Sequence, residues 1–266
     1  MRGPAETPTR RRRYIDTNRR FPEYDVSHVF QDLSAAIRVG LFPGRCASCG
    51  RRLPIPRGPF CTDCQTLVEP VGPRACPRCG REHETELVEE GPCLSCLRAS
   101  PPFESLHAGF VFRGPVADAV RRFKYRREPG LASSLAGLLP QSPAALHRDR
   151  ALVVPVPLHS KRLRRRGYNQ AALLARHFSR REALEFSVDA LERVRPTPPQ
   201  VEQPSANARR NNVRNAFRHR KNGELGGRDV ILIDDVVTSG STVSDCCRAL
   251  REAGVRTTFV VTLARG

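Results

Sequence analysis

Tryptophan is absent from this chain, and aromatic residues of every kind are scarce. The 266 residues include no Trp and four Tyr, and Phe, Trp and Tyr together make up 6%. Stacking on aromatic rings is a common way for a protein to bind unpaired bases without reading their sequence. Any contact with single-stranded nucleic acid is therefore expected to be mainly electrostatic.

Long apolar runs are absent as well. No stretch approaches the roughly 20 apolar residues that cross a bilayer. The arginine-rich N-terminus also lacks the apolar segment of a secretory signal. We therefore expect a cytoplasmic protein without membrane insertion, and we interpret residues 1–42 as a basic disordered tail with a short helix.

Acidic residues are too few to balance the basic ones. Lys and Arg number 45 against 27 Asp and Glu, so the formal net charge is +18. The excess is concentrated, because residues 161–167 hold five cations and no acid, and residues 193–222 hold eight cations and one acid. Such clusters suit pyrophosphate or a nucleic-acid backbone. A solvated basic surface is the alternative.

Eight of the ten cysteines form four Cys-x-x-Cys pairs, here called knuckles. They are Cys46/Cys49, Cys61/Cys64, Cys76/Cys79 and Cys93/Cys96. Two knuckles complete a tetrahedral Cys₄ zinc site. Disulfides are the competing interpretation, but a cytoplasmic setting keeps thiols reduced. We expect two closed, structural zinc sites in a module over residues 43–100, with sequential and interleaved pairing of the knuckles both open.

The remaining two cysteines have a different pattern. Cys246 and Cys247 fall with Val243 and Leu250 at positions i, i+3, i+4 and i+7 of one helical stripe. That spacing is typical of the face of a helix that packs on a core. We expect both thiols to be core residues.

Residues 229–242 are the most informative segment. Val230 to Ile233 is an apolar run typical of a buried parallel strand. It ends at two acids, Asp234 and Asp235, and a turn of small residues follows, comprising Thr238, Ser239, Gly240, Ser241 and Thr242. Ligands bind at the carboxyl ends of strands in open α/β sheets, and a turn that opens a helix offers N–H groups to a phosphate. The two acids are placed to hold sugar hydroxyls, so the segment predicts a sugar-phosphate site.

Apolar strands and amphipathic helices alternate over residues 105–266. The expected strands are 107–112, 152–156, 230–233 and 257–263, and the expected helices are 116–125, 131–139, 168–183 and a last one through Leu250. This alternation predicts an α/β domain with a parallel sheet and flanking helices, preceded by the small zinc module.

The Asp-Asp pair followed by Thr-x-Gly-x-Thr resembles the phosphoribosyl-pyrophosphate (PRPP) signature of type I phosphoribosyltransferases. Three further motifs accompany it, namely Val-Pro-Val-Pro-Leu-His (154–159), Arg-Arg-Gly-Tyr-Asn-Gln (165–170) and Thr-Pro-Pro-Gln (197–200). With the knuckles, and in this order, they make residues 43–266 similar to the ComF/ComFC family (competence protein F, GntX-like). The resemblance implies a type I phosphoribosyltransferase domain behind an N-terminal double zinc ribbon.

The resemblance also assigns roles to residues. Asp234 and Asp235 are the expected catalytic pair at the ribose hydroxyls, and residues 238–242 are expected to bind the 5′-phosphate. The strand-to-helix loop with Ser160, Lys161 and Arg162 is expected to grip the pyrophosphate of PRPP, which binds with Mg²⁺. A polar segment at 195–217 is expected to close over the pocket. Hypoxanthine-type enzymes carry an aspartate base where this chain has Thr238, which cannot accept a proton at neutral pH, so purine salvage is not expected.

Three functions remain in view. The first is a protein that binds PRPP and, if catalytic, transfers a pentosyl group to an acceptor. The second is a non-catalytic protein that handles single-stranded DNA in natural transformation. The third is a structural adaptor that docks a helicase-like competence protein. The sequence names no acceptor.

Overall fold

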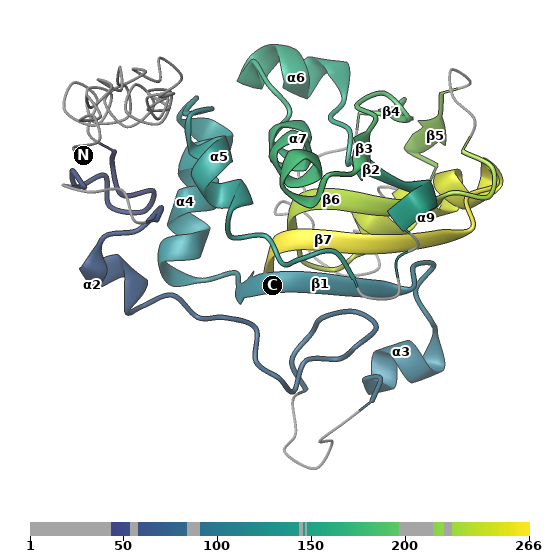
Figure 1. The fold of residues 1–266 in the computed structure, drawn as a ribbon, viewed down its shortest axis with the longest axis horizontal. Coiled ribbons are helices and arrows are strands. Elements are labelled where there is room, and N and C mark those ends of the chain that lie inside the picture. Colours follow the sequence, from purple (N-terminus) through teal and green to yellow (C-terminus); the bar gives the residue numbers. More distant parts are fainter. Residues whose placement is uncertain are drawn as a thin grey trace, which may run out of the picture. The chain divides into compact units, whose positions relative to one another are not determined.

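A five-stranded parallel sheet lies at the centre of the computed structural model (Figure 1). Its strands are β1 (Ser105–Val111), β2 (Ala151–Pro155), β3 (Glu185–Phe186), β6 (Asp229–Val237) and β7 (Thr257–Arg265), in the order β1-β7-β6-β2-β3. Every pairing in this sheet is parallel. The inner strands are buried on both faces, which explains their nearly continuous apolar sequences. The predicted α/β class is confirmed.

The structure describes residues 44–53, 58–83, 91–143, 146, 148–196, 215–220 and 225–266. All of them belong to one compact unit, Gly44–Gly266. The short helix expected within residues 1–42 lies outside the described residues. Among the described residues, no helix has the length and apolar character that crossing a membrane requires.

Helices cover the two faces of the sheet, because successive strand residues point to opposite sides. One face carries α4 (Gly114–Tyr125), α5 (Leu131–Ala136) and α7 (Gln170–Glu182), and its core includes Ile231 and Ile233. The other carries α9 (Ser241–Glu252) with the antiparallel pair β4 (Leu191–Arg193) and β5 (Phe217–His219), and its core includes Val230 and Leu232. Cys246 and Cys247 of α9 are fully buried in this second core, so their predicted packing role is confirmed.

The cysteine-rich segment contributes two short helices, α2 (Thr62–Gln65) and α3 (Leu94–Arg98), each starting directly after the first cysteine of a knuckle. Its first half packs into the main core, where Ala47 and Phe60 are buried in the same cluster as Phe123 of α4. Its second half runs beside β1, and the Leu106 N–H donates to the Arg78 carbonyl at 3.0 Å.

Among the differences from the sequence prediction, two concern the segments at the ends of β6 and β2. Strand β6 continues through Asp234 and Asp235 to Val237, because alternating residues of an extended strand place the two acids on different faces without breaking the ladder. The segment expected as a strand-to-helix loop already forms helix α6 (Ser160–Arg166), which follows the short η1 (Arg148–Arg150) and β2 along the chain. The ring of His159 accepts from the Lys161 N–H at 3.2 Å and caps this helix.

Candidate functional site

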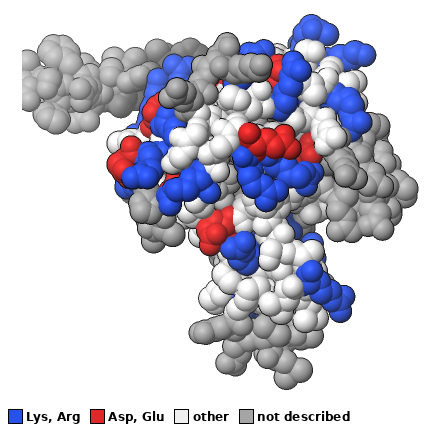
Figure 2. Space-filling model, turned by 90° about the vertical axis from the view of Figure 1, so that its right-hand side faces the viewer, with Lys and Arg blue, Asp and Glu red and all other residues white. Residues whose placement is uncertain are grey.

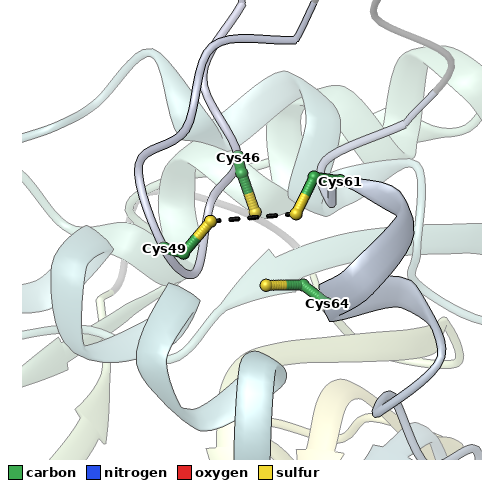
Figure 3. Close-up of side chains that lie close together, drawn as sticks. All are labelled: Cys46, Cys49, Cys61 and Cys64. Carbon is green, nitrogen blue, oxygen red and sulfur yellow. Dashed lines mark hydrogen bonds between the residues drawn. The ribbon is translucent and has the colours of Figure 1, made fainter.

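The knuckles pair in sequence order. Cys46, Cys49, Cys61 and Cys64 form one cluster and Cys76, Cys79, Cys93 and Cys96 form the other, with the sulfur atoms of each within 4.8 Å of one another. The four side chains of the first cluster point toward a common centre (Figure 3). The Cys49 and Cys61 sulfurs lie 3.8 Å apart, as do those of Cys79 and Cys93. A tetrahedron of ~2.3 Å Zn–S bonds spaces its sulfurs by ~3.8 Å, so both clusters fit zinc.

Backbone N–H groups support the thiolate form that binds metal. Burial raises the pKa of the Cys46 thiol, but hydrogen bonds from the Cys61, Cys49 and Ser48 backbone outweigh it and lower that pKa to about 6. In the second cluster the Cys93 N–H donates to the Cys76 sulfur at 3.2 Å. Each cluster supplies four protein ligands, so zinc would be closed off from substrate and structural.

A cleft of about 1090 Å³ opens where β6 and β2 end. Its walls are the first knuckle, α4, the segment from β2 into α7, and the start of the turn before α9. Its basic residues are Arg45, Arg121, Arg122, Lys124, Arg126, Arg162, Arg166 and Arg193, and its acids are Asp118, Asp234 and Asp235. The surplus of cations makes the cleft attractive to a polyanion.

The turn between β6 and α9 borders the cleft and a small pocket beside it. Gly240 has φ +77°, a left-handed conformation that side chains with a Cβ seldom adopt. A Cβ built there meets no atom within 4 Å, so the backbone of Gly240 faces open space at the start of α9. Thr238 and Thr242 also line this space, while Ser239 and Ser241 hydrogen-bond to each other through their hydroxyls at 2.9 Å. An uncovered helix N-terminus of this kind suits an anion.

The two acids lie beside that turn. Lys124, near the end of α4, pairs with Asp235 through Nζ and Oδ2 at 2.6 Å, and the Asp235 side chain is 8% exposed. The Asp235 N–H donates to the Asp234 carboxylate at 2.9 Å. Burial, with the charge of Asp235 second, raises the pKa of Asp234, and Lys124 opposes the rise. A raised pKa means that an ionised Asp234 costs folding free energy.

Asp234→Asn is therefore expected to stabilise the ligand-free protein at neutral pH. The folded-state pKa of Asp234 lies above its unfolded value of ~3.9, so the stability linked to its proton is present below ~pH 4 and is lost as the pH rises through the folded pKa. The Asn side chain does not titrate, so the gain in Tm should be larger at pH 8 than at pH 4. Each kcal/mol corresponds to roughly 2–4 °C in a domain of this size. Thermal scans of both proteins across that range, without Mg²⁺, measure the effect. A Tm gain that shrinks as the pH rises would contradict it.

Two arginines tie the zinc clusters to the walls of the cleft. Arg122 of α4 donates to the Cys46 carbonyl at 2.6 Å and to the Ala47 carbonyl at 3.2 Å. Arg265, at the end of β7, is 6% exposed and donates to the Cys79 carbonyl at 3.0 Å and the Val237 carbonyl at 2.9 Å. It also donates to the carbonyl of Thr238, which is the first residue of the turn. Arg265 thus links the turn to the second cysteine cluster by hydrogen bonds.

Comparisons with known proteins identify both parts of the chain. Residues 39–97 match the double zinc ribbon domain and residues 163–266 match the phosphoribosyl transferase domain. The chain is 32% identical over 228 residues to the DNA utilization protein YhgH of Escherichia coli O157:H7, covering 84% of this chain and 97% of that protein. It is 32% identical over 233 residues to competence protein F of Haemophilus influenzae, covering 85% and 99%. Competence protein ComFC of Bacillus subtilis is 25% identical over 204 residues, covering 73% and 78%. The chain belongs to the ComF family.

The Arg-Arg-Gly-Tyr-Asn-Gln motif of this ComF-family chain builds one wall of the cleft. Gly167 ends α6 in a left-handed conformation with φ +89°, and the Tyr168 hydroxyl bonds the Phe123 carbonyl of α4. Asn169 caps α7 through Ala171 N–H at 3.1 Å and donates to the Val156 carbonyl at 3.0 Å. The motif therefore fixes α6, α7 and α4 around the end of β2.

The cleft brings together half of the ten residues to which the sequence assigned catalytic or ligand-binding roles. Asp234, Asp235, Thr238, Thr242 and Arg162 line it, and Gly240 lines the small pocket beside it. Ser239 and Ser241 line neither space, and Ser160 and Lys161 are exposed on α6 and also lie outside the lining. Arg166 takes their place, since it lies one helical turn after Arg162 on the same face of α6. Lys124 and Arg193 were missed because no motif surrounds them. Residues 197–214 of the expected closing segment lie outside the described residues.

Proposed function

We propose that this ComF-family protein binds PRPP with Mg²⁺ in the cleft and holds or transfers its phosphoribosyl group. The observation that carries the proposal is the left-handed Gly240 turn at the start of α9, next to two acids at the end of a buried parallel strand. The turn offers backbone N–H groups to a phosphate, and the two carboxylates beside it can accept hydrogen bonds from sugar hydroxyls. Both lie in a cleft rich in cations. The match of residues 163–266 to the phosphoribosyl transferase domain supports the same ligand.

Different residues of the cleft would bind different parts of PRPP. The turn at 238–242 would hold the 5′-phosphate, and Asp234 and Asp235 would accept hydrogen bonds from the ribose hydroxyls. Arg162, Arg166 and Arg193 would face the pyrophosphate, whose charge Mg²⁺ shares when bound. In the ligand-free protein the Lys124 ammonium group pairs with the Asp235 carboxylate. Lys124 would move away from Asp235 when the ribose binds, because the ribose hydroxyls need the same carboxylate oxygen.

Transfer would break the bond between C1′ and the pyrophosphate oxygen, and the electron pair would leave with pyrophosphate. A lone pair of the acceptor would form the new bond to C1′. The protein's contribution is to stabilise the charge of the leaving group with fixed cations and to position the ribose. We also infer a cytoplasmic location, because the two zinc clusters need reduced thiols.

Titration calorimetry with PRPP and Mg²⁺ tests the proposal. Asp235→Asn is expected to weaken PRPP binding by roughly 10–100-fold, since a hydrogen bond to a charged group is worth ~1.5–3 kcal/mol. Asp189→Asn is the matched control, because Asp189 is exposed and lies outside the cleft lining. A wild-type protein that releases no binding heat with PRPP at several temperatures would refute the function. Equal affinities for wild type and Asp235→Asn would place PRPP elsewhere.

Binding of single-stranded DNA is a second candidate, favoured by charge. Lys161, Arg164 and Arg165 are exposed along α6. Lys and Arg side chains are spread over the face drawn in Figure 2, where Asp and Glu side chains lie beside several of them. The names of the relatives, DNA utilization protein and competence protein, point the same way. A contact with the DNA backbone would be blind to base sequence.

Its test is the salt dependence of binding. If the exposed α6 cations each contact a phosphate, log affinity should fall linearly with log salt, and replacing Lys161, Arg164 and Arg165 with Ala should reduce the slope by ~2, at ~0.7 for each contact. Replacing Arg176 and Arg180, which are exposed on α7, should leave the slope unchanged. Fluorescence anisotropy that detects no binding at low salt removes this candidate.

A further inference from the structure

The guanidinium group of Arg265 reaches from the second cysteine cluster to the turn at 238–242, here called the Gly240 turn. Its Nε donates to the carbonyl of Cys79, one of the expected zinc ligands, at 3.0 Å. Its Nη1 donates to the carbonyl of Val237 at 2.9 Å and to that of Thr238. One rigid planar group therefore contacts both a cluster residue and the first residue of the turn.

The Gly240 turn begins where the pairing of β6 with β7 stops. The last pair of that ladder is Val237 with Arg265, and the Gly266 N–H donates to the Val237 carbonyl at 3.0 Å. Thr238 lies one residue past the ladder, and its carbonyl accepts from the Arg265 side chain. This side chain thus extends the contact of β7 with the chain into the turn.

Arg265 is a buried cation, with 6% of its surface exposed. Among the described residues, no Asp or Glu side chain pairs with it, and its other printed acceptor is the Gly266 carbonyl. Burial of a charge is costly unless opposite charge lies close to it. Four thiolates on one Zn²⁺ would give the second cluster a net charge of about −2, which favours a cation in contact with one of its ligands.

Zinc would also fix the backbone of Cys79. Its sulfur lies 3.8 Å from that of Cys93, and the Cys93 N–H donates to the Cys76 sulfur at 3.2 Å. A structural zinc site gains its order from the ion, because the binding free energy is folding free energy. The knuckle is closely packed, since a Cβ at Gly80 would lie 2.9 Å from the Leu106 carbonyl oxygen of β1. Close packing of this kind transmits strain to its neighbours.

The first cluster is attached to a different part of the cleft. Arg122 of α4 donates to the carbonyls of Cys46, Ala47 and Ser48 at 2.6, 3.2 and 3.4 Å. This arginine has a carboxylate partner of its own, Glu128, at 2.6 Å. Loss of order in the first cluster should therefore affect α4 and not the Gly240 turn, so the first cluster is an internal control.

We propose that the second cluster is a zinc-dependent control of the Gly240 turn, with Arg265 as the positioning residue between them. A filled cluster keeps the Thr238 carbonyl in place and the turn ordered for a phosphate. An empty cluster would leave Arg265 without the thiolate charge and without a fixed partner at Cys79, so the turn would loosen. Coupling between two binding sites is reciprocal, so a phosphate at the turn also raises the zinc affinity of the second cluster. The choice of PRPP as the phosphate rests on the proposed function.

Hydrogen exchange followed by mass spectrometry tests the coupling without PRPP. Cys93→Ser and Cys61→Ser remove matched ligands from the two clusters, since each cysteine directly precedes a short helix, α3 or α2. Cys93→Ser is expected to speed exchange over residues 236–245 about tenfold, the effect of losing one hydrogen bond to a charged group, while Cys61→Ser leaves it unchanged. Exchange in β2 reports whether the fold is kept. Equal effects of the two variants, or none, would refute the proposal.

A double-mutant cycle tests Arg265 as the residue that carries the coupling. In the Arg265→Ala background, Cys93→Ser should add nothing to the exchange rate of the turn, because the contact is already lost. Arg265→Lys keeps the charge and should restore part of the effect of Cys93→Ser. A further tenfold increase on top of Arg265→Ala would show that the coupling does not pass through this side chain.

The reciprocal effect is measured on the wild-type protein. A chelator removes the zinc in excess Mg²⁺, with and without PRPP, and Cys61→Ser and Cys93→Ser identify which cluster empties at each step. PRPP is expected to raise the chelator concentration that empties the second cluster about tenfold and to leave that of the first unchanged. Equal shifts for both clusters would indicate general stabilisation and refute the control. Failure of the zinc-loaded wild type to bind PRPP refutes the proposed function, and the exchange experiment then decides the coupling alone.

Discussion

Replacing Gly240 with valine is expected to reduce PRPP binding by at least 100-fold. Gly240 adopts φ +77°, and a β-branched residue in this region costs more than the ~1–2 kcal/mol of an ordinary side chain. The new side chain would also fill the open space in front of the N-terminus of α9, where the 5′-phosphate would approach the backbone. Calorimetry with PRPP and Mg²⁺, alongside a urea titration, measures both effects.

Two companion variants separate strain from obstruction. Gly227 has φ +71° and equally open surroundings, but it lies in the turn before β6, so Gly227→Val should cost stability without changing PRPP affinity. Gly240→Asn tolerates the left-handed conformation yet still adds a side chain in the cradle. It should keep the fold and lose the ligand. If Gly240→Asn binds PRPP as wild type does, the phosphate does not occupy this turn.

Replacing Arg265 with alanine is expected to lower the free energy of unfolding by about 3–5 kcal/mol, because it removes a buried charged donor from several carbonyls at once. Those carbonyls belong to Cys79 in the second zinc cluster and to Val237 and Thr238 at the start of the turn. Freed from this anchor, the turn should bind PRPP about tenfold more weakly. Urea denaturation and calorimetry report the two quantities.

Controls for Arg265 distinguish an anchor from a general loss of charge. Arg251→Ala removes an exposed arginine from the last turn of α9 and should change neither quantity by a measurable amount. Arg265→Lys keeps the charge with fewer donors in a different geometry, so it should fall between wild type and Ala. Zinc content should stay at about two equivalents in all three proteins, since the eight ligands remain. An unchanged urea midpoint for Arg265→Ala would show that these contacts do not hold the turn.

The parts of the site that the sequence predicts are those that depend on local spacing. The apolar run before Asp234, the small-residue turn and the knuckles each fold within a few residues, and the structure has each of them where the pattern indicates. The strands β3, β4 and β5 have two or three residues each, too few to show a period, and the sequence predicted none of them. The sequence could not decide how the knuckles pair, because their spacings permit both sequential and interleaved pairing. The structure shows sequential pairing.

The parts that it misses are those made by tertiary contact. Lys124 sits in an ordinary basic amphipathic helix, and only the packing of α4 on the sheet brings it to Asp235. Arg265 has no motif around it either, and its role arises because β7 ends between the turn and the second zinc cluster. Local patterns carry no information about which distant segment a long side chain will reach.

The strand order has a consequence for the timing of folding. Within the sheet β1 pairs only with β7, so the first strand to leave the ribosome waits for the last before it gains a parallel neighbour. Until then, its described backbone partners include the segment around Pro70, which forms a single antiparallel bridge with Phe110. Contacts so far apart in sequence slow folding. In a nascent chain β1 therefore lacks its parallel neighbour until the last strand of the sheet is made, and its open edge can pair with other chains during that time.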